Sequence, residues 1–273
     1  MSNLLQRIIT ALLGVGIILT AIVYSQHTFA LAFGLIMLLT LEEFYKLAKS
    51  AGTAPFEKWG LFFALILFAL SYGIHAGLIE SKYLWLLPAL LFVCFIFPLY
   101  THRDQKPINC LAMTLFGVIY VALPFTLLIT IGYLPGSYDF SLIIGLLLAQ
   151  WASDTGAYIA GRTLGKTKLF ESVSPNKTWE GTIGGGVLSL GILYGWSLYF
   201  DALNTVEWLG LALIVVVFGS LGDLIESLFK RSLAIKDSGS RLPGHGGFLD
   251  RFDGLIISIP FATAYLILIS QVF

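Results

Sequence analysis

The chain has 273 residues, of which 57% are hydrophobic and only 12% are charged, and its formal net charge at pH 7 is zero. Its mean hydropathy is +0.86. A soluble protein of this length needs far more charge to cover its surface, so the composition excludes a soluble enzyme and indicates an integral membrane protein. The balanced charge, without a basic tail, gives no reason to expect nucleic acid as a partner.

Apolar runs long enough to cross the roughly 30 Å hydrocarbon core of a bilayer recur along the chain. Backbone groups inside a bilayer must be hydrogen-bonded internally, and strand-like alternation is absent, so these runs predict helices. We expect an all-α, polytopic integral membrane protein with about nine transmembrane helices. The predicted spans are 8–25, 28–46, 60–79, 83–100, 110–134, 140–161, 180–200, 208–229 and 254–273.

The basic residues predict the orientation of these spans. If the spans alternate from a cytoplasmic N-terminus, all but one of the 16 Lys and Arg lie on the cytoplasmic side, and the exception is Lys82. This is the distribution that the positive-inside rule requires. The first apolar run is longer than that of a signal peptide and no small-residue cleavage site follows it, so we expect a retained helix.

The two halves of the chain differ in content. Residues 1–134 are largely spans with short connections, and we expect them to form a scaffold that carries dimer and lipid contacts. Most Gly-rich polar sequence follows Gln150, so residues 135–273 are expected to form the catalytic region with its cytoplasmic loops. Cys94 and Cys110 lie in or beside spans without metal-ligand spacing, and we expect them to be small buried hydrophobes.

A polar stripe crosses the sixth predicted span, in "AQWASDTGAYIAGR". Gln150, Asp154 and Tyr158 are four residues apart and share one helix face. Asp154 is eight residues from Arg162 at the cytoplasmic boundary, which is roughly 12 Å at about 1.5 Å per residue. An ionisable group at that depth must face protein or water, so Asp154 is a substrate-binding candidate. The alternative is a structural aspartate bonded to a neighbouring helix.

The segment "SPNKTWEG" leads into the seventh predicted span. Ser174 followed by Pro175 is a good N-cap and first-turn pair, so we expect a helix from there with Lys177 and Thr178 in its first turn. The positive end of a helix beside a lysine favours phosphate, which makes Ser174 and Lys177 substrate-binding candidates. The glycines at 184–186 are expected to permit close helix packing.

Acidic residues also mark the eighth predicted span, in "GDLIESLFKR". Asp223, Glu226, Ser227 and Lys230 fall at helical spacing on one face. Asp223 is eight residues before Arg231, so its depth is about that of Asp154, again roughly 12 Å. Two carboxylates at matching depth predict a shared water-filled cavity open to the cytoplasm. The alternative is that Asp223 is only neutralised by a lysine.

The last loop, "KDSGSRLPGHGGFLDRFDG", combines carboxylates, basic residues and glycines. Asp250 and Asp253 stand at the start of the ninth span, where they would offer oxygen ligands suited to Mg²⁺ or serve as helix caps. Gly246 and Gly247 allow backbone amides to approach an anion closely. Further donors and positive charge come from Lys236, Arg241, His245 and Arg251. The loop therefore predicts a site for phosphates and a divalent metal.

These motifs resemble a known family. Residues 227–253, "SLFKRSLAIKDSGSRLPGHGGFLDRFD", are similar to the signature of phosphatidate cytidylyltransferases at every specified position: S-x-hydrophobic-K-R, K-D, P-x-H-G-G and D-R-x-D. The segments "SDTGAY" and "SPNKTWEG" also resemble upstream blocks of that family. The resemblance covers about residues 145–255 by motif, and the rest of the chain by size and hydropathy only.

The resemblance implies a nucleotidyltransferase of phospholipid biosynthesis that converts CTP and phosphatidate into CDP-diacylglycerol and pyrophosphate. It implies a Mg²⁺-dependent, multi-pass homodimer of the bacterial inner membrane, with the active site facing the cytoplasm. A second cation, monovalent or divalent, is left open. Carried onto this chain, the metal-binding acids are Asp223, Asp250 and Asp253, and Lys236 is a further catalytic residue. The substrate-binding residues are Ser174, Lys177, Lys230, Arg231, Arg241, His245, Gly246, Gly247, Arg251 and Asp154.

Three other functions are compatible with parts of the sequence. A CDP-alcohol phosphotransferase would also join nucleotide, metal and lipid, but its D-G-x₂-A-R pattern is absent. A transporter would use Asp154 and Asp223 as ion-coupling sites, although no matched pair of broken helices is found. An inactive membrane scaffold would have no reason to keep the acids at 250 and 253 together with Arg251.

Overall fold

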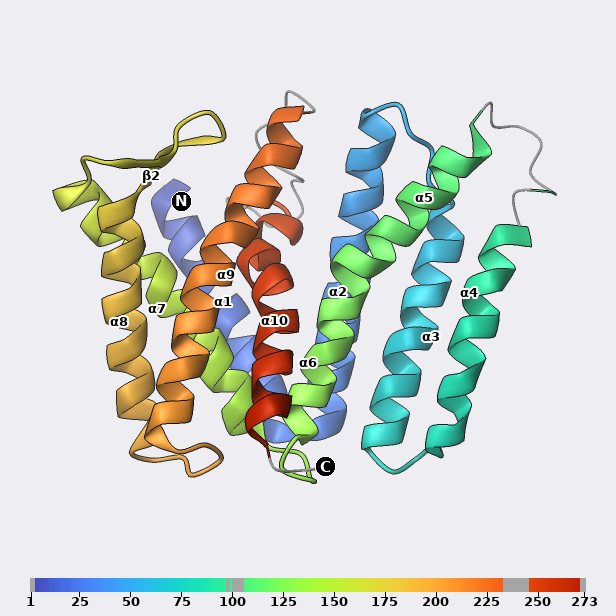
Figure 1. The fold of residues 1–273 in the computed structure, drawn as a ribbon, viewed down its shortest axis with the longest axis horizontal. Coiled ribbons are helices and arrows are strands. Elements are labelled where there is room, and N and C mark those ends of the chain that lie inside the picture. Colours follow the sequence, from blue (N-terminus) through green and yellow to red (C-terminus); the bar gives the residue numbers. More distant parts are fainter. Residues whose placement is uncertain (1–2, 97–98, 100–105, 233–245, 271–273) are drawn as a thin grey trace. The chain divides into compact units, whose positions relative to one another are not determined.

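The structure is a computed structural model that describes residues 3–96, 99, 106–232 and 246–270, with side chains described from residue 11 onward. The described chain is mainly helical, with one short two-stranded sheet (Figure 1). It falls into two compact units. The first comprises the described parts of Met1–Thr130 and Asp237–Arg251, and the second those of Ile131–Lys236 and Phe252–Phe273.

The first unit is built from helices that follow one another along the chain. They are α1 (Asn3–Tyr24), α2 (Gln26–Ser50), α3 (Glu57–His75), the 3₁₀ turn η1 (Ser81–Trp85), α4 (Leu86–Ile96) and α5 (Pro107–Gly117). A π-helical turn, η3 (Val118–Ala122), continues α5 into α6 (Leu123–Tyr133). Cys94 and Cys110 are buried and free, as expected.

Tyr45 fixes α2 against its neighbours in the first unit, where α2, α3 and α5 lie side by side (Figure 1). Its side chain is fully buried, and its hydroxyl donates to the backbone oxygen of Thr114 at 2.8 Å. A Cβ atom on Gly60 of α3 would lie 2.0 Å from that hydroxyl, and one on Gly117 would lie 2.5 Å from the tyrosine ring. These glycines are therefore needed for the close approach of three helices.

The second unit begins with α7 (Phe140–Leu164), followed by the hairpin strands β1 (Lys168–Phe170) and β2 (Ser174–Thr178). The remaining helices are α8 (Trp179–Ser197), α9 (Thr205–Ser232) and α10 (Leu249–Ile269). The first residues of α10, up to Arg251, belong to the first unit. The hairpin pairs antiparallel and connects α7 to α8.

Glycines bring α7 and α8 into backbone contact. A Cβ atom on Gly156 would lie 2.6 Å from the carbonyl oxygen of Gly184, and one on Gly185 would lie 2.5 Å from that of Ser153. The expected packing role of the triple glycine is therefore confirmed for Gly184 and Gly185. Gly186 differs, because its Cβ would meet only Val216, at an ordinary 3.7 Å.

The expectation that a helix begins at Ser174 is wrong. Residues Ser174–Thr178 form β2, and α8 begins at Trp179 with Thr178 as its N-cap, whose side chain accepts from the Gly181 amide at 3.1 Å. The strand is stabilised by its antiparallel partner β1. Directly after the strand, the Trp179 amide donates to the backbone oxygen of Thr167 at 3.0 Å. Lys177 therefore lies on a strand and not in the first turn of a helix.

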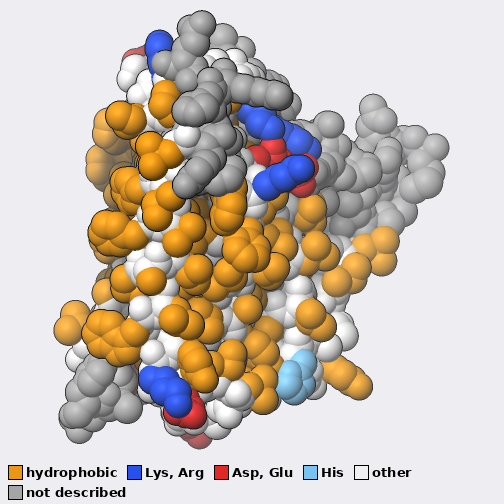
Figure 2. Space-filling model, turned by 90° about the vertical axis from the view of Figure 1, so that its right-hand side faces the viewer, with side chains coloured by type: hydrophobic (Ala, Val, Ile, Leu, Met, Phe, Trp, Pro, Cys, Tyr) orange, Lys and Arg blue, Asp and Glu red, His pale blue; other side chains and the backbone are white. Residues whose placement is uncertain are grey.

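The described residues include six helical segments long and apolar enough to cross a membrane, namely α2, α3, the run Pro107–Tyr133, α7, α9 and α10. The described parts of the other three predicted spans overlap α1, η1 with α4, and α8. Figure 2 shows a mainly hydrophobic face with charged side chains near its two ends, which is typical of a lipid-facing surface. The expected all-α membrane class is confirmed, and the count of nine crossings and the cytoplasmic N-terminus stay predictions.

Candidate active site

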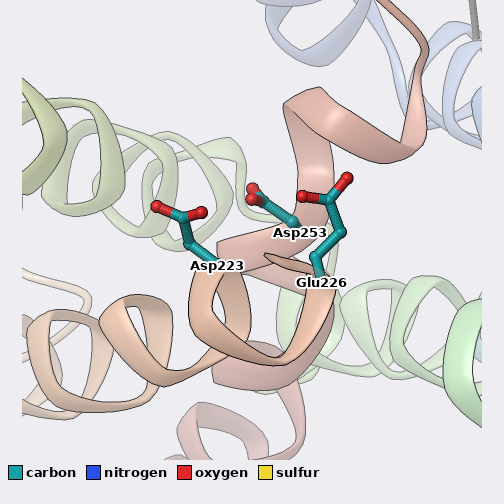
Figure 3. A group of neighbouring side chains, drawn as sticks. All are labelled: Asp223, Glu226 and Asp253. Atoms are coloured by element: carbon teal, nitrogen blue, oxygen red, sulfur yellow. The ribbon is translucent and has the colours of Figure 1, made fainter. Parts of the chain in front are cut away.

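Three carboxylates converge in the second unit: Asp223 and Glu226 from α9, and Asp253 from α10. One oxygen from each lies within 4.8 Å of the others, and Figure 3 shows the side chains turned toward one another. Glu226 is only 1% exposed, whereas the side chain of Asp223 is 44% exposed. This acid cluster therefore has a buried inner side and an accessible outer side.

The close approach of two helices creates the acid cluster. Asp223 and Glu226 are three residues apart on α9 and share one face. The adjacent Gly222 allows α10 to approach, because a Cβ atom there would lie 2.5 Å from the backbone oxygen of Asp253. Asp253 is oriented by the amide of Gly254, which donates to its Oδ1 at 2.7 Å.

Two lysines balance part of the negative charge. Lys177 of β2 places its Nζ 2.6 Å from Oδ2 of Asp223 and donates to the backbone oxygen of Ser220 at 3.2 Å. Lys230, one turn further along α9, places its Nζ 2.5 Å from Oε2 of Glu226. With all five groups ionised, three carboxylates and two ammonium groups leave one excess negative charge.

Gln150 connects the predicted polar stripe of α7 to the two acid-bearing helices. Its side chain is 6% exposed, and its Nε2 donates to Oδ1 of Asp154 at 3.1 Å. A Cβ atom on Gly219 of α9 would lie 2.3 Å from Oε1 of Gln150, and one on Gly254 of α10 would lie 2.5 Å from Nε2. Gln150 therefore faces α9 and α10, whereas Asp154 and Tyr158 of the same stripe are exposed.

Asp250 belongs to the first unit, where it closes a tight turn at the start of α10. Gly246 has a φ of +79°, in the left-handed region that glycine adopts without a steric penalty. The Gly247 amide donates to Oδ2 of Asp250 at 2.9 Å, and a Cβ atom on Gly246 would lie 2.6 Å from the same oxygen. Arg251 follows in the same turn with an exposed side chain. The roles predicted for these residues stay predictions.

The remaining predicted residues are distributed around the second unit or lie outside the described residues. Ser174, half-buried, begins β2 opposite Phe170, and Arg231 is exposed in the last turn of α9. Lys236, Arg241 and His245 lie outside the described residues. The predicted residues that the structure brings together are therefore Asp223, Asp253, Lys177 and Lys230.

Glu226 is the member of the acid cluster that the sequence analysis did not assign to the site. The helical spacing of α9 placed it on the face of Asp223, but it precedes the first residue of the matched signature, Ser227. Its 1% exposure is the decisive observation, because a buried carboxylate needs a partner.

The donor set of the acid cluster fits a hard divalent cation. Mg²⁺ prefers oxygen ligands and is usually held by one or two carboxylates together with substrate phosphates and water. Asp223, Glu226 and Asp253 offer three such oxygens within 4.8 Å of one another. The partial exposure of Asp223 leaves room for a phosphate on the outer side.

A model of the cytidylyltransferase family matches residues 5–269. The chain belongs to the cytidylyltransferase family. A phosphatidate cytidylyltransferase of Staphylococcus haemolyticus is 36% identical over 266 residues, which cover 96% of this chain and 98% of that protein. Proteins of the same name from Staphylococcus aureus strain COL and Staphylococcus saprophyticus are 42% and 40% identical over 185 residues, which cover 66% of this chain and 69% of each relative. The family match includes all three residues of the acid cluster.

Proposed function

We propose that this cytidylyltransferase transfers CMP from CTP to phosphatidate, which yields CDP-diacylglycerol and pyrophosphate. The observation that carries this proposal is the similarity to a phosphatidate cytidylyltransferase over 266 residues at 36% identity. The acid cluster supports it, because nucleotidyl transfer requires groups that bind metal and phosphate. The lysines beside the cluster supply positive charge for two polyanionic substrates.

The transfer is a substitution at phosphorus. A phosphate oxygen of phosphatidate attacks the α-phosphorus of CTP, a new P–O bond forms, and the bond to the β-phosphate breaks to release pyrophosphate. At pH 7 the phosphate of phosphatidate is already largely ionised, so a strong general base is unnecessary. The enzyme must instead bring two anions together and stabilise the charge that develops on the leaving group.

The residues of the acid cluster have distinct roles in this reaction. Asp223, Glu226 and Asp253 would hold Mg²⁺, which when bound supplies Lewis-acid stabilisation of phosphate charge. Lys177 is held beside α9 by its bond to the backbone oxygen of Ser220, so its ammonium group is placed to receive a phosphate oxygen. Lys230 neutralises the most buried carboxylate of the cluster.

The proposed setting is the cytoplasmic membrane of a bacterium, with the site facing the cytoplasm. The bacterial relatives and the long apolar helices support a multi-pass membrane protein. The concentration of Lys and Arg on one side of the predicted topology supports the direction. Magnesium dependence, a second cation and a homodimer are part of the proposal by resemblance to the family.

The test is transfer of label into lipid. Detergent-purified protein is incubated with phosphatidate and CTP labelled at its α-phosphorus, with and without Mg²⁺, and the mixture is extracted with organic solvent. We expect label in the lipid phase only when both phosphatidate and the metal are present. CTP labelled at its γ-phosphorus is the matched control, and its label should stay in the aqueous phase with pyrophosphate.

Absence of lipid-phase label from folded protein supplied with phosphatidate would refute the proposal. Substrate flux through sealed vesicles without consumption of CTP would instead favour a transporter.

A further inference from the structure

A buried glutamate of the first unit binds the start of a helix far away in sequence. Glu43 lies on α2 and is only 2% exposed. Its Oε2 accepts a hydrogen bond from the backbone amide of Leu249 at 3.1 Å, across a separation of 206 residues. Leu249 is the first residue of α10, and the amides of a first helical turn have no partner within the helix. Glu43 therefore satisfies a donor that α10 cannot satisfy itself.

The helix that carries Glu43 is held firmly from another side. Tyr45 lies two residues further along, so its side chain projects about 200° away around the helix axis. The tyrosine fastens α2 to α3 and α5 through its hydroxyl bond to Thr114 and its contacts with two glycines. Glu43 thus projects from a helix whose position is fixed by packing, so its carboxylate can hold the Leu249 amide in place.

A carboxylate is a stronger acceptor for this contact than a neutral side chain would be. Burial of an acid is costly unless it is hydrogen-bonded, and here the amide of Leu249 and the positive end of α10 offset that cost. A hydrogen bond to an ionised acceptor is roughly twice as strong as a neutral one. The neighbouring Glu42 differs, because it is partly exposed and pairs with Lys46 of its own helix at 2.7 Å.

The contact with Glu43 lies directly beside a predicted metal ligand. Leu249 is followed by Asp250, whose Oδ2 accepts from the Gly247 amide. Residues 247–250 therefore receive two carboxylate–amide bonds, one from within the turn and one from α2. We propose that Glu43 is a positioning residue that holds the first turn of α10, and with it the carboxylate of Asp250, in the orientation needed for CMP transfer. The catalytic part of this inference rests on the proposed function.

The first test is hydrogen exchange of the metal-free protein, which does not depend on activity. In Glu43→Leu, peptides containing residues 247–251 should exchange about tenfold faster or more, because a buried charge-assisted bond is lost. Glu42→Leu is the matched control and should leave these peptides unchanged. Glu43→Gln keeps an acceptor oxygen without the charge, so its exchange should be intermediate. Unchanged exchange in Glu43→Leu overturns the proposal.

The second test separates positioning from mere stabilisation. Glu43→Leu should raise the KM for Mg²⁺ by about tenfold, a larger factor than its effect on the KM for CTP, and the KM of Glu43→Gln should lie between those of Glu43→Leu and the wild type. Asp250→Asn shows the effect of losing the Asp250 carboxylate itself. If exchange rises while the KM for Mg²⁺ is unchanged, Glu43 is only a structural cap and the positioning role is wrong.

Failure of the role proposed for Glu43 can be told apart from failure of the proposed function. If Glu43→Leu does not fold, Glu43→Gln carries the test, and wild-type values for both its exchange and its KM for Mg²⁺ overturn the proposal. If the wild-type protein transfers no CMP, the proposed function fails, and the catalytic part of this inference fails with it. The exchange experiment then still decides whether Glu43 holds the start of α10.

Discussion

Glu226 is the most deeply buried carboxylate of the acid cluster, and its position explains how three acids can lie so close. Its charge is balanced by Lys230 one helical turn away, while the more exposed Asp223 is balanced by Lys177 from the hairpin. Each lysine therefore forms an ion pair with one acid of α9. With Asp223 and Glu226 each paired to a lysine, the third carboxylate, that of Asp253, accounts for the excess negative charge of the cluster.

Glu226→Gln should weaken metal binding without unfolding the protein. The amide has almost the same shape but removes one anionic ligand, so we expect a loss of about tenfold or more in metal affinity and a matching rise in the KM for Mg²⁺. Mn²⁺ binding followed by electron paramagnetic resonance gives the affinity directly. Glu171→Gln, in the exposed hairpin turn, is the control and should bind metal normally. Wild-type affinity in Glu226→Gln would remove this residue from the site.

Local spacing predicted part of the site, and long-range contacts determined the rest. Helical periodicity placed Asp223 and Glu226 on one face, and the signature identified Asp253. The meeting of these side chains depends on the crossing of α9 and α10 at Gly222, which spacing along one helix does not contain. The bond between Glu43 and the Leu249 amide, across 206 residues, was inaccessible to sequence reasoning for the same reason.

At the scale of elements, long apolar runs were predicted reliably and a short hairpin was not. The described part of each predicted span lies mainly in helix, because hydropathy is a property of the run itself. The strand β2 depends instead on β1 and on Glu180, whose Oε2 accepts from the amides of Lys166 and Thr167 at 3.1 Å. Ser174 and Pro175 formed a plausible cap locally, but this external pairing moved the start of α8 to Trp179.

The close packing of α7 and α8 predicts unequal effects of two alanine substitutions in α8. Gly185→Ala places a methyl group against the backbone oxygen of Ser153, which cannot rotate away, so we expect destabilisation by about 1–3 kcal/mol. Gly191→Ala has no atom within 4 Å of the new methyl and should be neutral or slightly stabilising. Thermal unfolding in detergent measures both. Equal effects would contradict the packing described for this pair of helices.

At the scale of the whole molecule, the distribution of Lys and Arg predicts on which side each loop lies. Cys94 and Cys110 are buried, so new single cysteines can be labelled against a low background. An impermeant maleimide should label Lys82→Cys in right-side-out vesicles, but Glu171→Cys only after permeabilisation. The reverse labelling pattern would show that the predicted orientation of the chain in the membrane is wrong. Labelling of both from the same side would contradict the predicted alternation of spans.

The length of α9 bears on how a lipid substrate is used. Its 28 residues extend about 42 Å, longer than the roughly 30 Å of hydrocarbon, and Asp223 lies about 13 Å from its last residue. The acids of α9 therefore lie in the half of the bilayer that contains the C-terminal end of this helix. Phosphatidate can then react while both its acyl chains stay in the membrane. The reaction rate should accordingly show surface dilution, depending on the mole fraction of phosphatidate in the bilayer rather than on its bulk concentration.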